Sequence, residues 1–314
     1  MKKHITVLMG GPSAEFTVSL STGQSIIKHL DKKEFSVSKV LIDQKKNWFI
    51  DDKPVLLKEV VHFLKNEVWF CFLALHGRFG EDGTIQGFLE TLEVAYSGSR
   101  VLASALAMDK HKTLTLLEHA GLPVPQHIFL ESSNKIDKLK IKFPCVVLPN
   151  NSGSSVGVSI CFSEDEFERA LKKAFSESSA IIISQYLKGM EISVPILGEG
   201  YLPIIEIIPK TSKFYDYKAK YQEGGSQHII PARLPKAIYK KAGSLALLVH
   251  KLIGCRAYSR VDMIIANDKP YILEINTLPG MTPTSLLPQA ALKAGISYPE
   301  LLKLMIHYSL TEKT

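Results

Sequence analysis

The sequence predicts an α/β fold in which an N-terminal doubly wound parallel sheet is followed by a two-lobed α+β region. Near the start of the chain, strand-like runs at 5–9, 35–42 and 68–75 alternate with a helical pattern at 18–30. This order is typical of a parallel sheet covered by helices. The run at 68–75 is apolar throughout, as expected for a strand that is buried on both faces. Later strand-like runs are close enough in sequence to pair as hairpins.

The rest of the chain divides into a small and a larger α+β unit. A helix is predicted over 100–120, because Gly121 and Pro123 stop the pattern there. The small unit then has strands at 145–148, 158–162 and 180–184 and a helix from Ser163. The larger unit has hairpins at 192–197 with 201–208 and at 257–266 with 271–275, and helices at 236–253 and 286–294. We expect three domains and a functional lid, since long loops in compact domains usually serve function: domains at 1–106, 107–188 and 189–314, with the lid loop at 209–235.

Composition limits the classes of partner. The 314 residues are 46% hydrophobic and carry a net charge of +7, which permits an anionic partner such as a nucleotide or a nucleic acid. No basic run with interleaved aromatic residues occurs, so we expect no nucleic-acid partner. No apolar run is long enough to span a membrane, and 5–9 is too short for a signal peptide. Four scattered cysteines are expected to be reduced thiols of a cytoplasmic protein.

Two triplets near the C-terminus carry the clearest chemical pattern. Arg260-Val261-Asp262 and Glu274-Ile275-Asn276 each alternate polar and apolar residues, so the polar side chains of each triplet share one strand face. If the two strands pair, Asp262, Glu274 and Asn276 converge, and their oxygen atoms suit Mg²⁺. Arg260 beside them would stabilise developing negative charge. A solvated sheet face with salt bridges explains the spacing equally well.

Three loops and a helix start add weaker patterns. The loop 150–157 exposes backbone N–H groups that suit phosphate, although no Lys or Arg lies between 143 and 160. The loop 76–83 follows a buried strand, where open α/β sheets bind ligands, or it is a structural loop before a helix. Glu15 near a helix start is favoured as a cap over a ligand for a substrate cation. The loop 278–286 precedes a helix whose N-terminus suits a carboxylate.

Six motifs in the same order make the chain resemble the D-alanine–D-alanine ligases of the ATP-grasp superfamily over nearly its whole length. They are GGPSAEFTVSLSTG at 10–23, HGRFGEDGTIQG at 76–87, MDKHKT at 108–113, SGSSVG at 152–157, FYDYKAKYQEGGSQHIIPA at 214–232 and RVDMIIANDKPYILEINTLPGMTPTSLLP at 260–288. The resemblance implies a pre-ATP-grasp domain followed by an ATP-grasp. It implies a ligase that joins two D-alanines through an acyl phosphate for peptidoglycan precursor synthesis. ATP and two Mg²⁺ ions (or Mn²⁺) would be required, and a homodimer is a possible assembly.

The resemblance also implies a role for each matching residue. In the substrate site, Glu15 would bind the ammonium of the first D-alanine in a hydrogen-bonded trio with Ser154 and Tyr221, and His76 would lie near the carboxylate of that D-alanine. Arg260 and the Gly280 N–H would bind the oxyanion. Ser285 and the Leu286 N–H would bind the carboxylate of the second D-alanine. In the nucleotide site, Lys110, Ser154, Ser155, Leu187, Glu191 and Lys220 would contact ATP, with Lys220 at the transferred phosphoryl group. Asp262, Glu274 and Asn276 would bind the metal ions.

One departure from the family pattern concerns phosphate binding. Leu148 stands where the family has a lysine, and Ser184 begins a segment where the family commonly has an acidic residue. Loss of one lysine–phosphate contact costs about 1.5–3 kcal/mol, which is a weakening of roughly ten- to a hundred-fold. Three alternatives follow: a D-alanine ligase with weaker ATP binding, a ligase for D-serine or D-lactate as second substrate, and a non-catalytic nucleotide-binding paralogue. Tyr221 argues against D-lactate.

Overall fold

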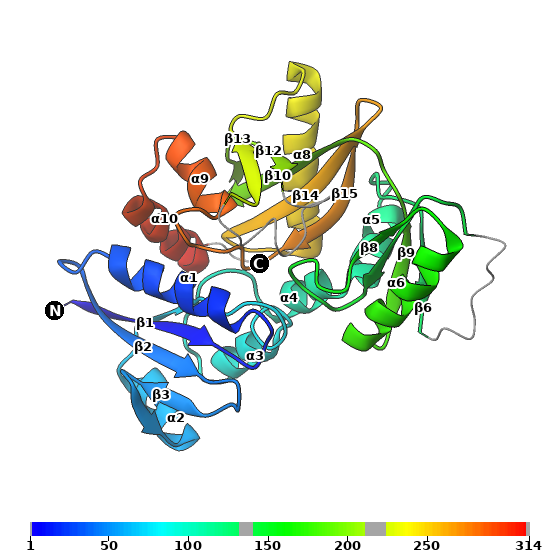
Figure 1. Cartoon of the computed structure of the whole chain (residues 1–314). Helices are drawn as coiled ribbons and strands as arrows, with labels where there is room; N and C mark the ends of the chain where they lie inside the picture. The colour runs from blue at the N-terminus through cyan, green and yellow to red at the C-terminus, as the bar shows by residue number, and fades with distance from the viewer. Residues whose placement is uncertain (1, 132–140, 211–223, 312–314) are drawn as a thin grey trace.

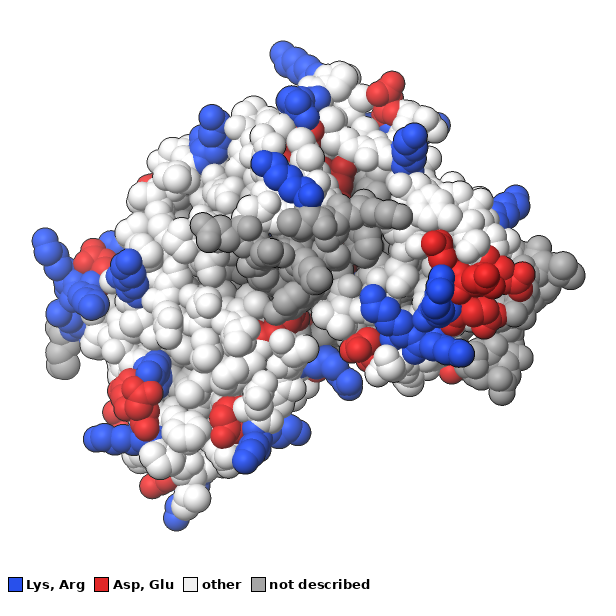
Figure 2. Space-filling model, in the orientation of Figure 1, with Lys and Arg blue, Asp and Glu red and all other residues white. Residues whose placement is uncertain are grey.

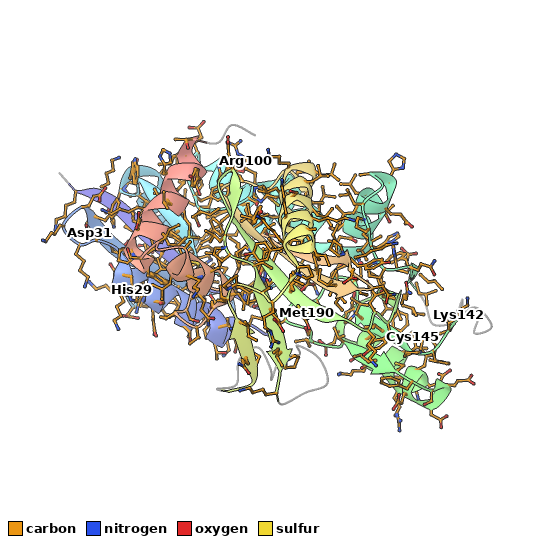
Figure 3. The ribbon with its side chains drawn as sticks, turned by 90° about the horizontal axis from the view of Figure 1, so that it is seen from above. His29, Asp31, Arg100, Lys142, Cys145 and Met190 are labelled. Carbon is orange, nitrogen blue, oxygen red and sulfur yellow. The ribbon has the colours of Figure 1, made fainter. Side chains whose placement is uncertain are left out.

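The computed structural model describes residues 2–131, 141–210 and 224–311. The strands form three sheets, and each sheet takes its strands from one of the three predicted domains. The domain boundaries themselves stay a prediction. Figures 1 and 3 show the N-terminal sheet and the central unit at opposite ends of the molecule, with the C-terminal sheet between them; Asp31 marks one end in Figure 3 and Cys145 the other.

The N-terminal sheet has the order β4-β3-β2-β1-β5. Its first strand, β1 (Lys3–Gly10), lies between β2 (Phe35–Ile42) and β5 (Phe70–Leu73) and is parallel to both. The parallel sheet is therefore confirmed at its centre. Its edge is an antiparallel hairpin of β3 (Trp48–Ile50) and β4 (Lys53–Val55) that the sequence reading missed. This sheet is accompanied by α1 (Phe16–His29), α2 (Leu57–Asn66) and α3 (Thr84–Thr91).

Helix α1 lies closely against β1. A Cβ atom on Gly23 would lie 2.4 Å from the Met9 Cε atom, so only glycine permits this approach. The helix therefore holds a fixed position beside the sheet (Figure 1). Its N-terminus is placed next to the carboxyl ends of β1 and β5, where ligands bind in open α/β sheets.

The predicted helix over 100–120 is wrong, because the structure has two helices there. They are α4 (Val101–Met108) and α5 (Lys110–His119), and Asp109 between them has φ −89° and ψ 94°. The Asp109 carboxylate accepts a hydrogen bond from the Lys112 N–H and so caps α5. The apolar pattern continues across the break and conceals it.

The central sheet has the order β6-β9-β7-β8 and is antiparallel throughout. The helix predicted from Ser163 is confirmed as α6, which Ser163 caps by accepting the Glu166 N–H. This helix buries Phe167, Ala170, Leu171 and Ala174. The strands are β6 (His127–Leu130), β7 (Cys145–Pro149), β8 (Ser159–Cys161) and β9 (Ile181–Gln185), and α6 spans Glu164–Glu177.

The C-terminal sheet has the order β13-β12-β10-β14-β15, with β11 paired to β10. The hairpin predicted with 201–208 is interrupted, since Leu202–Ile204 separate β11 from β12. Strand β13 occupies part of the predicted lid loop at 209–235, and residues 211–223 of that loop lie outside the described residues. The elements are β10 (Met190–Leu197), β11 (Gly200–Tyr201), β12 (Ile205–Pro209), β13 (Ser226–Ile229), α8 (Lys236–Ile253), β14 (Tyr258–Ala266), β15 (Lys269–Asn276), α9 (Leu286–Lys293) and α10 (Tyr298–Thr311).

The buried side chains form three clusters. The first joins the N-terminal sheet to α9 and α10. The second lies between the C-terminal sheet and α8 and includes Leu117 of α5. The third belongs to the central sheet and α6 alone. The central unit is therefore packed separately from the rest, and the spaces beside it are natural places for ligands.

Surface charge and helix length are relevant to nucleic acids and membranes, the two partners that the sequence analysis did not expect. On the face in Figure 2, the Lys and Arg side chains are scattered and form no continuous patch among the described residues. None of the helices in the described part of the chain is both long and apolar enough to cross a membrane.

Candidate active site

The pairing of β14 with β15 assembles the polar face predicted from the two triplets. Asp262 lies opposite Glu274, and Arg260 lies opposite Asn276. The turn at Asn267 and Asp268, both with positive φ, sets the register next to the turn, because such turns match the twist of paired strands. A one-residue register shift between Asp262 and Met263 then brings Asp262 opposite Glu274. The predicted pairing is confirmed.

The charges on this face are paired and mostly buried. Asp262, 6% exposed, accepts hydrogen bonds from Arg260 Nε at 2.9 Å, Arg260 Nη2 at 2.7 Å and Ser193 Oγ at 2.6 Å. A Glu274 oxygen lies 3.3 Å from Lys110 Nζ. The ion pairs of the alternative, a salt-bridged sheet face, are present; Asp262 is buried, whereas the Glu274 side chain is 30% exposed. Buried charges with close partners of this kind are typical of functional sites.

A polar cavity of about 380 Å³ opens in front of this face. Its walls come from the start of α1, the loop after β5, the loop 150–157, the strands β14 and β15, and the loop before α9. The structure thus brings together eight predicted site residues on one cavity: Glu15, His76, Ser154, Arg260, Asn276, Gly280, Ser285 and Leu286.

Glu15 does not cap its helix, contrary to the local preference. It occupies the N-cap position of α1, but its side chain makes no cap hydrogen bond. Its Oε1 instead accepts a hydrogen bond from Ser154 Oγ. A Cβ atom on Gly153 would lie 2.6 Å from Glu15 Oε2, so a larger residue there would displace the carboxylate. Ser154 has a φ of 50°, a left-handed conformation that non-glycine residues rarely adopt. The carboxylate thus joins the N-terminal domain to the central loop.

His76 is held by a residue that the sequence reading missed. Its Nε2 atom lies 3.0 Å from Thr22 Oγ1, and its Nδ1 atom lies 3.6 Å from Glu81 Oε1. Thr22 Oγ1 also accepts the Met281 N–H at 3.5 Å. Thr22 therefore connects the loop after β5 to the loop before α9. It stands seven residues after Glu15 and hence on the same helix face, a signal that was present in the sequence.

The loop before α9 is fixed from two sides. Ser285 Oγ accepts the Thr282 N–H at 3.1 Å and pairs with Thr282 Oγ1 at 2.8 Å. Tyr298 donates a hydrogen bond to the Met281 carbonyl, and burial raises the pKa of Tyr298 to about 12. The N-terminus of α9 faces the cavity, as an anion site requires.

A second, more apolar cavity of about 480 Å³ lies between the central and C-terminal sheets. Its apolar wall residues, such as Val146, Ile182 and Leu273, suit a planar ring system, and polar side chains such as Lys110, Glu191 and Glu274 also line it. Leu148, where the resemblance implies a lysine, lines this cavity. The predicted nucleotide residues on its wall are Lys110, Ser155, Leu187 and Glu191, together with the metal candidate Glu274.

The two cavities meet at β15. Glu274 lines the second cavity and Asn276 the first, and both line a space of about 40 Å³ between them, with Lys110 and Gly153. In the described part of the chain, no three His, Cys, Asp or Glu side chains cluster as metal ligands. The predicted metal ligands are not such a group, because they comprise the carboxylates of Asp262 and Glu274 and the amide of Asn276. Lys220 and Tyr221 lie outside the described residues.

Comparison with known proteins settles the family. A family model described as "D-ala D-ala ligase C-terminus" matches residues 116–307, and one described as "D-ala D-ala ligase N-terminus" matches residues 4–62 and 56–99. The chain belongs to the D-alanine–D-alanine ligase family. A ligase of this name from Citrifermentans bemidjiense is 44% identical over 302 residues, which cover 96% of this chain and 94% of that protein.

Solved structures of ligases in this family have the same fold. The D-alanine–D-alanine ligase of Bacillus anthracis complexed with ATP has a TM-score of 0.83 at 35% identity, covering 98% of this chain and 97% of that one. The VanG D-Ala:D-Ser ligase of Enterococcus faecalis has a TM-score of 0.85 at 27% identity, covering 98% and 100%. The predicted fold class, with its ATP-grasp, is confirmed. The chain is accordingly an ATP-binding enzyme of the ligase class.

Proposed function

We propose that this protein joins two D-alanines into D-alanyl-D-alanine, with ATP as the energy source, for peptidoglycan precursor synthesis. The observation that carries the proposal is the pair of cavities that adjoin at β15. One is apolar enough for a nucleobase, the other is polar enough for amino acids, and Lys110 with Glu274 lies between them. A phosphoryl group can then pass from a nucleotide in one cavity to a carboxylate in the other.

The proposed reaction activates one carboxylate and then couples it. ATP phosphorylates the carboxylate of the first D-alanine, the amine of the second attacks the resulting acyl phosphate, and phosphate leaves. Glu15 binds the first ammonium group, with His76 near the first carboxylate. Arg260 and the Gly280 N–H stabilise the oxyanion, and Ser285 and the Leu286 N–H bind the second carboxylate. Ser154 and Tyr221 complete the trio with Glu15, and Lys220 contacts the transferred group.

Asp262, Glu274 and Asn276 are the residues that would hold Mg²⁺. Their oxygen atoms fit a hard divalent ion. Asp262 and Glu274 are paired across β14 and β15, and Glu274 and Asn276 line the space between the two cavities, whereas Asp262 lies behind them with its carboxylate bonded to Arg260 and Ser193. Bound there, two Mg²⁺ ions would neutralise the phosphate charge during transfer; Mn²⁺ has similar preferences. In this structure Arg260 and Lys110 neutralise these carboxylates.

Nucleotide binding is proposed for Lys110, Ser154, Ser155, Leu187 and Glu191 with Lys220. Because Leu148 contributes no charge, Lys110 carries a larger share of phosphate neutralisation than in relatives that have the second lysine. We also propose a cytoplasmic location, where the nucleotide and free amino acids are available, and a homodimer as the assembly.

Phosphate release tests the proposal. Purified protein is incubated with millimolar ATP, Mg²⁺ and D-alanine, and the product is identified by mass spectrometry. We expect phosphate and D-alanyl-D-alanine in equal amounts and no activity in Asp262→Asn. Parallel reactions add D-serine or D-lactate, because the VanG neighbour is named for D-serine. A mixed product would identify a different second substrate, and absence of phosphate with every amino acid would indicate a non-catalytic paralogue.

A further inference from the structure

Asn150 directly follows strand β7 in a fully hydrogen-bonded, buried position. It is 3% exposed. Its Oδ1 atom accepts the His111 N–H at 2.8 Å, and its Nδ2 atom donates to Asp109 Oδ1 at 2.9 Å and to Asn151 Oδ1. Its carbonyl accepts the Lys110 N–H at 3.3 Å. One side chain and one carbonyl therefore hold three consecutive residues at the start of α5.

These bonds join two separately packed parts of the molecule. Strand β7 contributes to the core of the central unit, whereas α5 buries Leu117 in the core of the C-terminal sheet. Among the described residues, no apolar cluster contains side chains of both α5 and β7. The polar contacts of Asn150 connect α5 to the central unit, together with the His111 ring, which stacks on Phe129 of β6 with 4.0 Å between ring centroids. Buried hydrogen bonds of this kind specify geometry well.

This connection fixes the position of Lys110. It is the first residue of α5, and Asn150 bonds its own N–H and that of the next residue. The far end of the Lys110 side chain donates to the Ser152 carbonyl at 2.8 Å and lies 3.3 Å from Glu274. Residues 150 and 152 of one loop thus hold both the backbone and the ammonium group of Lys110.

The start of α5 does not by itself require Asn150. Asp109 already caps the helix through the Lys112 N–H at 3.1 Å. Burial raises the pKa of Asp109, but hydrogen bonds from Asn150 and Lys112 outweigh burial, and the pKa lies below its usual value. The contacts of Asn150 therefore exceed what helix capping demands.

We propose that Asn150 is a positioning residue for nucleotide binding, which fixes the ammonium group of Lys110 at the junction of the two cavities. The inference rests on the proposed contact between Lys110 and the nucleotide phosphates. It also accounts for how a chain with Leu148 in place of a lysine keeps its remaining lysine effective.

A double-mutant cycle tests the inference. In Asn150→Ala, the KM for ATP is expected to rise about tenfold, the effect of one lost hydrogen bond to a charged system, with the KM for D-alanine within about twofold of wild type. In Lys110→Ala the KM for ATP rises at least as much. The double variant is expected to match Lys110→Ala, because Asn150 acts through Lys110. If the increases in the KM for ATP of the two single variants multiply in the double variant, the inference is wrong and Asn150 has a purely structural role.

If Asn150→Ala folds poorly, exchanging the amide of Asn150 and the carboxylate of Asp109 gives an independent test. Asn150→Asp places two carboxylates together and raises the KM for ATP, and adding Asp109→Asn restores a donor–acceptor pair and the wild-type KM. Failure of this rescue would also contradict the inference. Asn66→Ala, which removes an exposed hydrogen bond at the end of α2, is the control. An unchanged KM in Lys110→Ala refutes the proposed role of Lys110, whereas a raised KM there with an unchanged KM in Asn150→Ala refutes only the role of Asn150.

Discussion

Leu148 is the residue whose identity should matter most for nucleotide affinity. It is half-buried on β7, opposite Ile182 of β9, and lines the second cavity. Leu148→Lys should tighten ATP binding roughly ten- to a hundred-fold, because it restores one charged contact with phosphate. Titration calorimetry with ATP and Mg²⁺ measures the change, and Leu148→Met, which lengthens the side chain without charge, should bind as wild type. Equal affinity in the lysine variant would show that the cavity differs from that of relatives.

His250 should make stability depend on pH. It is 4% exposed, and its Nδ1 atom lies 2.7 Å from Ser259 Oγ. Burial lowers its pKa to about 4, from 6.5 when exposed. The folded state therefore resists protonation, so the stabilisation is complete above pH 6.5 and is lost as pH falls toward 4. The loss from this group at pH 5 is about 2 kcal/mol.

Denaturant titration at pH 7 and pH 5 measures this contribution. The change in unfolding free energy between the two pH values should be smaller by about 2 kcal/mol in His250→Gln, which cannot be protonated. An identical pH dependence in the two proteins would mean that the buried imidazole is not responsible.

At the scale of elements, Arg256 connects the strand β14 region to the N-terminal domain. It is 5% exposed, and its Nε and Nη2 atoms donate to the carbonyls of Gly98 and Tyr96, each at 2.8 Å. Arg256→Met would leave both carbonyls without these partners and should cost about 2–4 kcal/mol of unfolding free energy. Arg256→Lys keeps the charge without the fork and should cost less. A loss below about 0.5 kcal/mol in the methionine variant would show that water replaces the guanidinium.

Predictability from sequence also differs between elements. The β14–β15 pair and α8 follow from local patterns: alternating triplets, an Asn-Asp turn and a helix that ends at Gly254 with φ 77°. The β3–β4 hairpin was missed because its strands are three residues long and only half-buried or exposed. The break at Asp109 was missed because a capping carboxylate looks like any polar residue inside an amphipathic pattern.

Local sequence patterns predicted the site as a set of residues but not as a set of contacts, and the contact of Glu15 with Ser154 was predicted by the resemblance alone. Local reasoning made Glu15 a helix cap, whereas its partner Ser154 lies 139 residues away. Thr22 and Asn150 were missed for the same reason, since their importance comes from partners that lie far from them in the sequence. Periodicity reports which face of an element is buried, and it contains no information about which distant loop meets that face.

At the scale of the whole molecule, the central unit has its own core, and Ser154 reaches from it across the first cavity to Glu15. Ser154→Ala should therefore weaken binding of the first D-alanine and leave the fold intact. We expect its KM to rise roughly tenfold or more, the effect of one charged hydrogen bond, with the unfolding temperature within a few degrees of wild type. Steady-state kinetics measures the KM for D-alanine, and thermal unfolding measures the unfolding temperature. Ser152→Ala is the matched control, because Ser152 contacts Lys110 through its carbonyl, which the substitution keeps. If Ser154→Ala instead lowers the unfolding temperature strongly and leaves the KM unchanged, this contact stabilises the association of domains and contributes nothing to substrate binding.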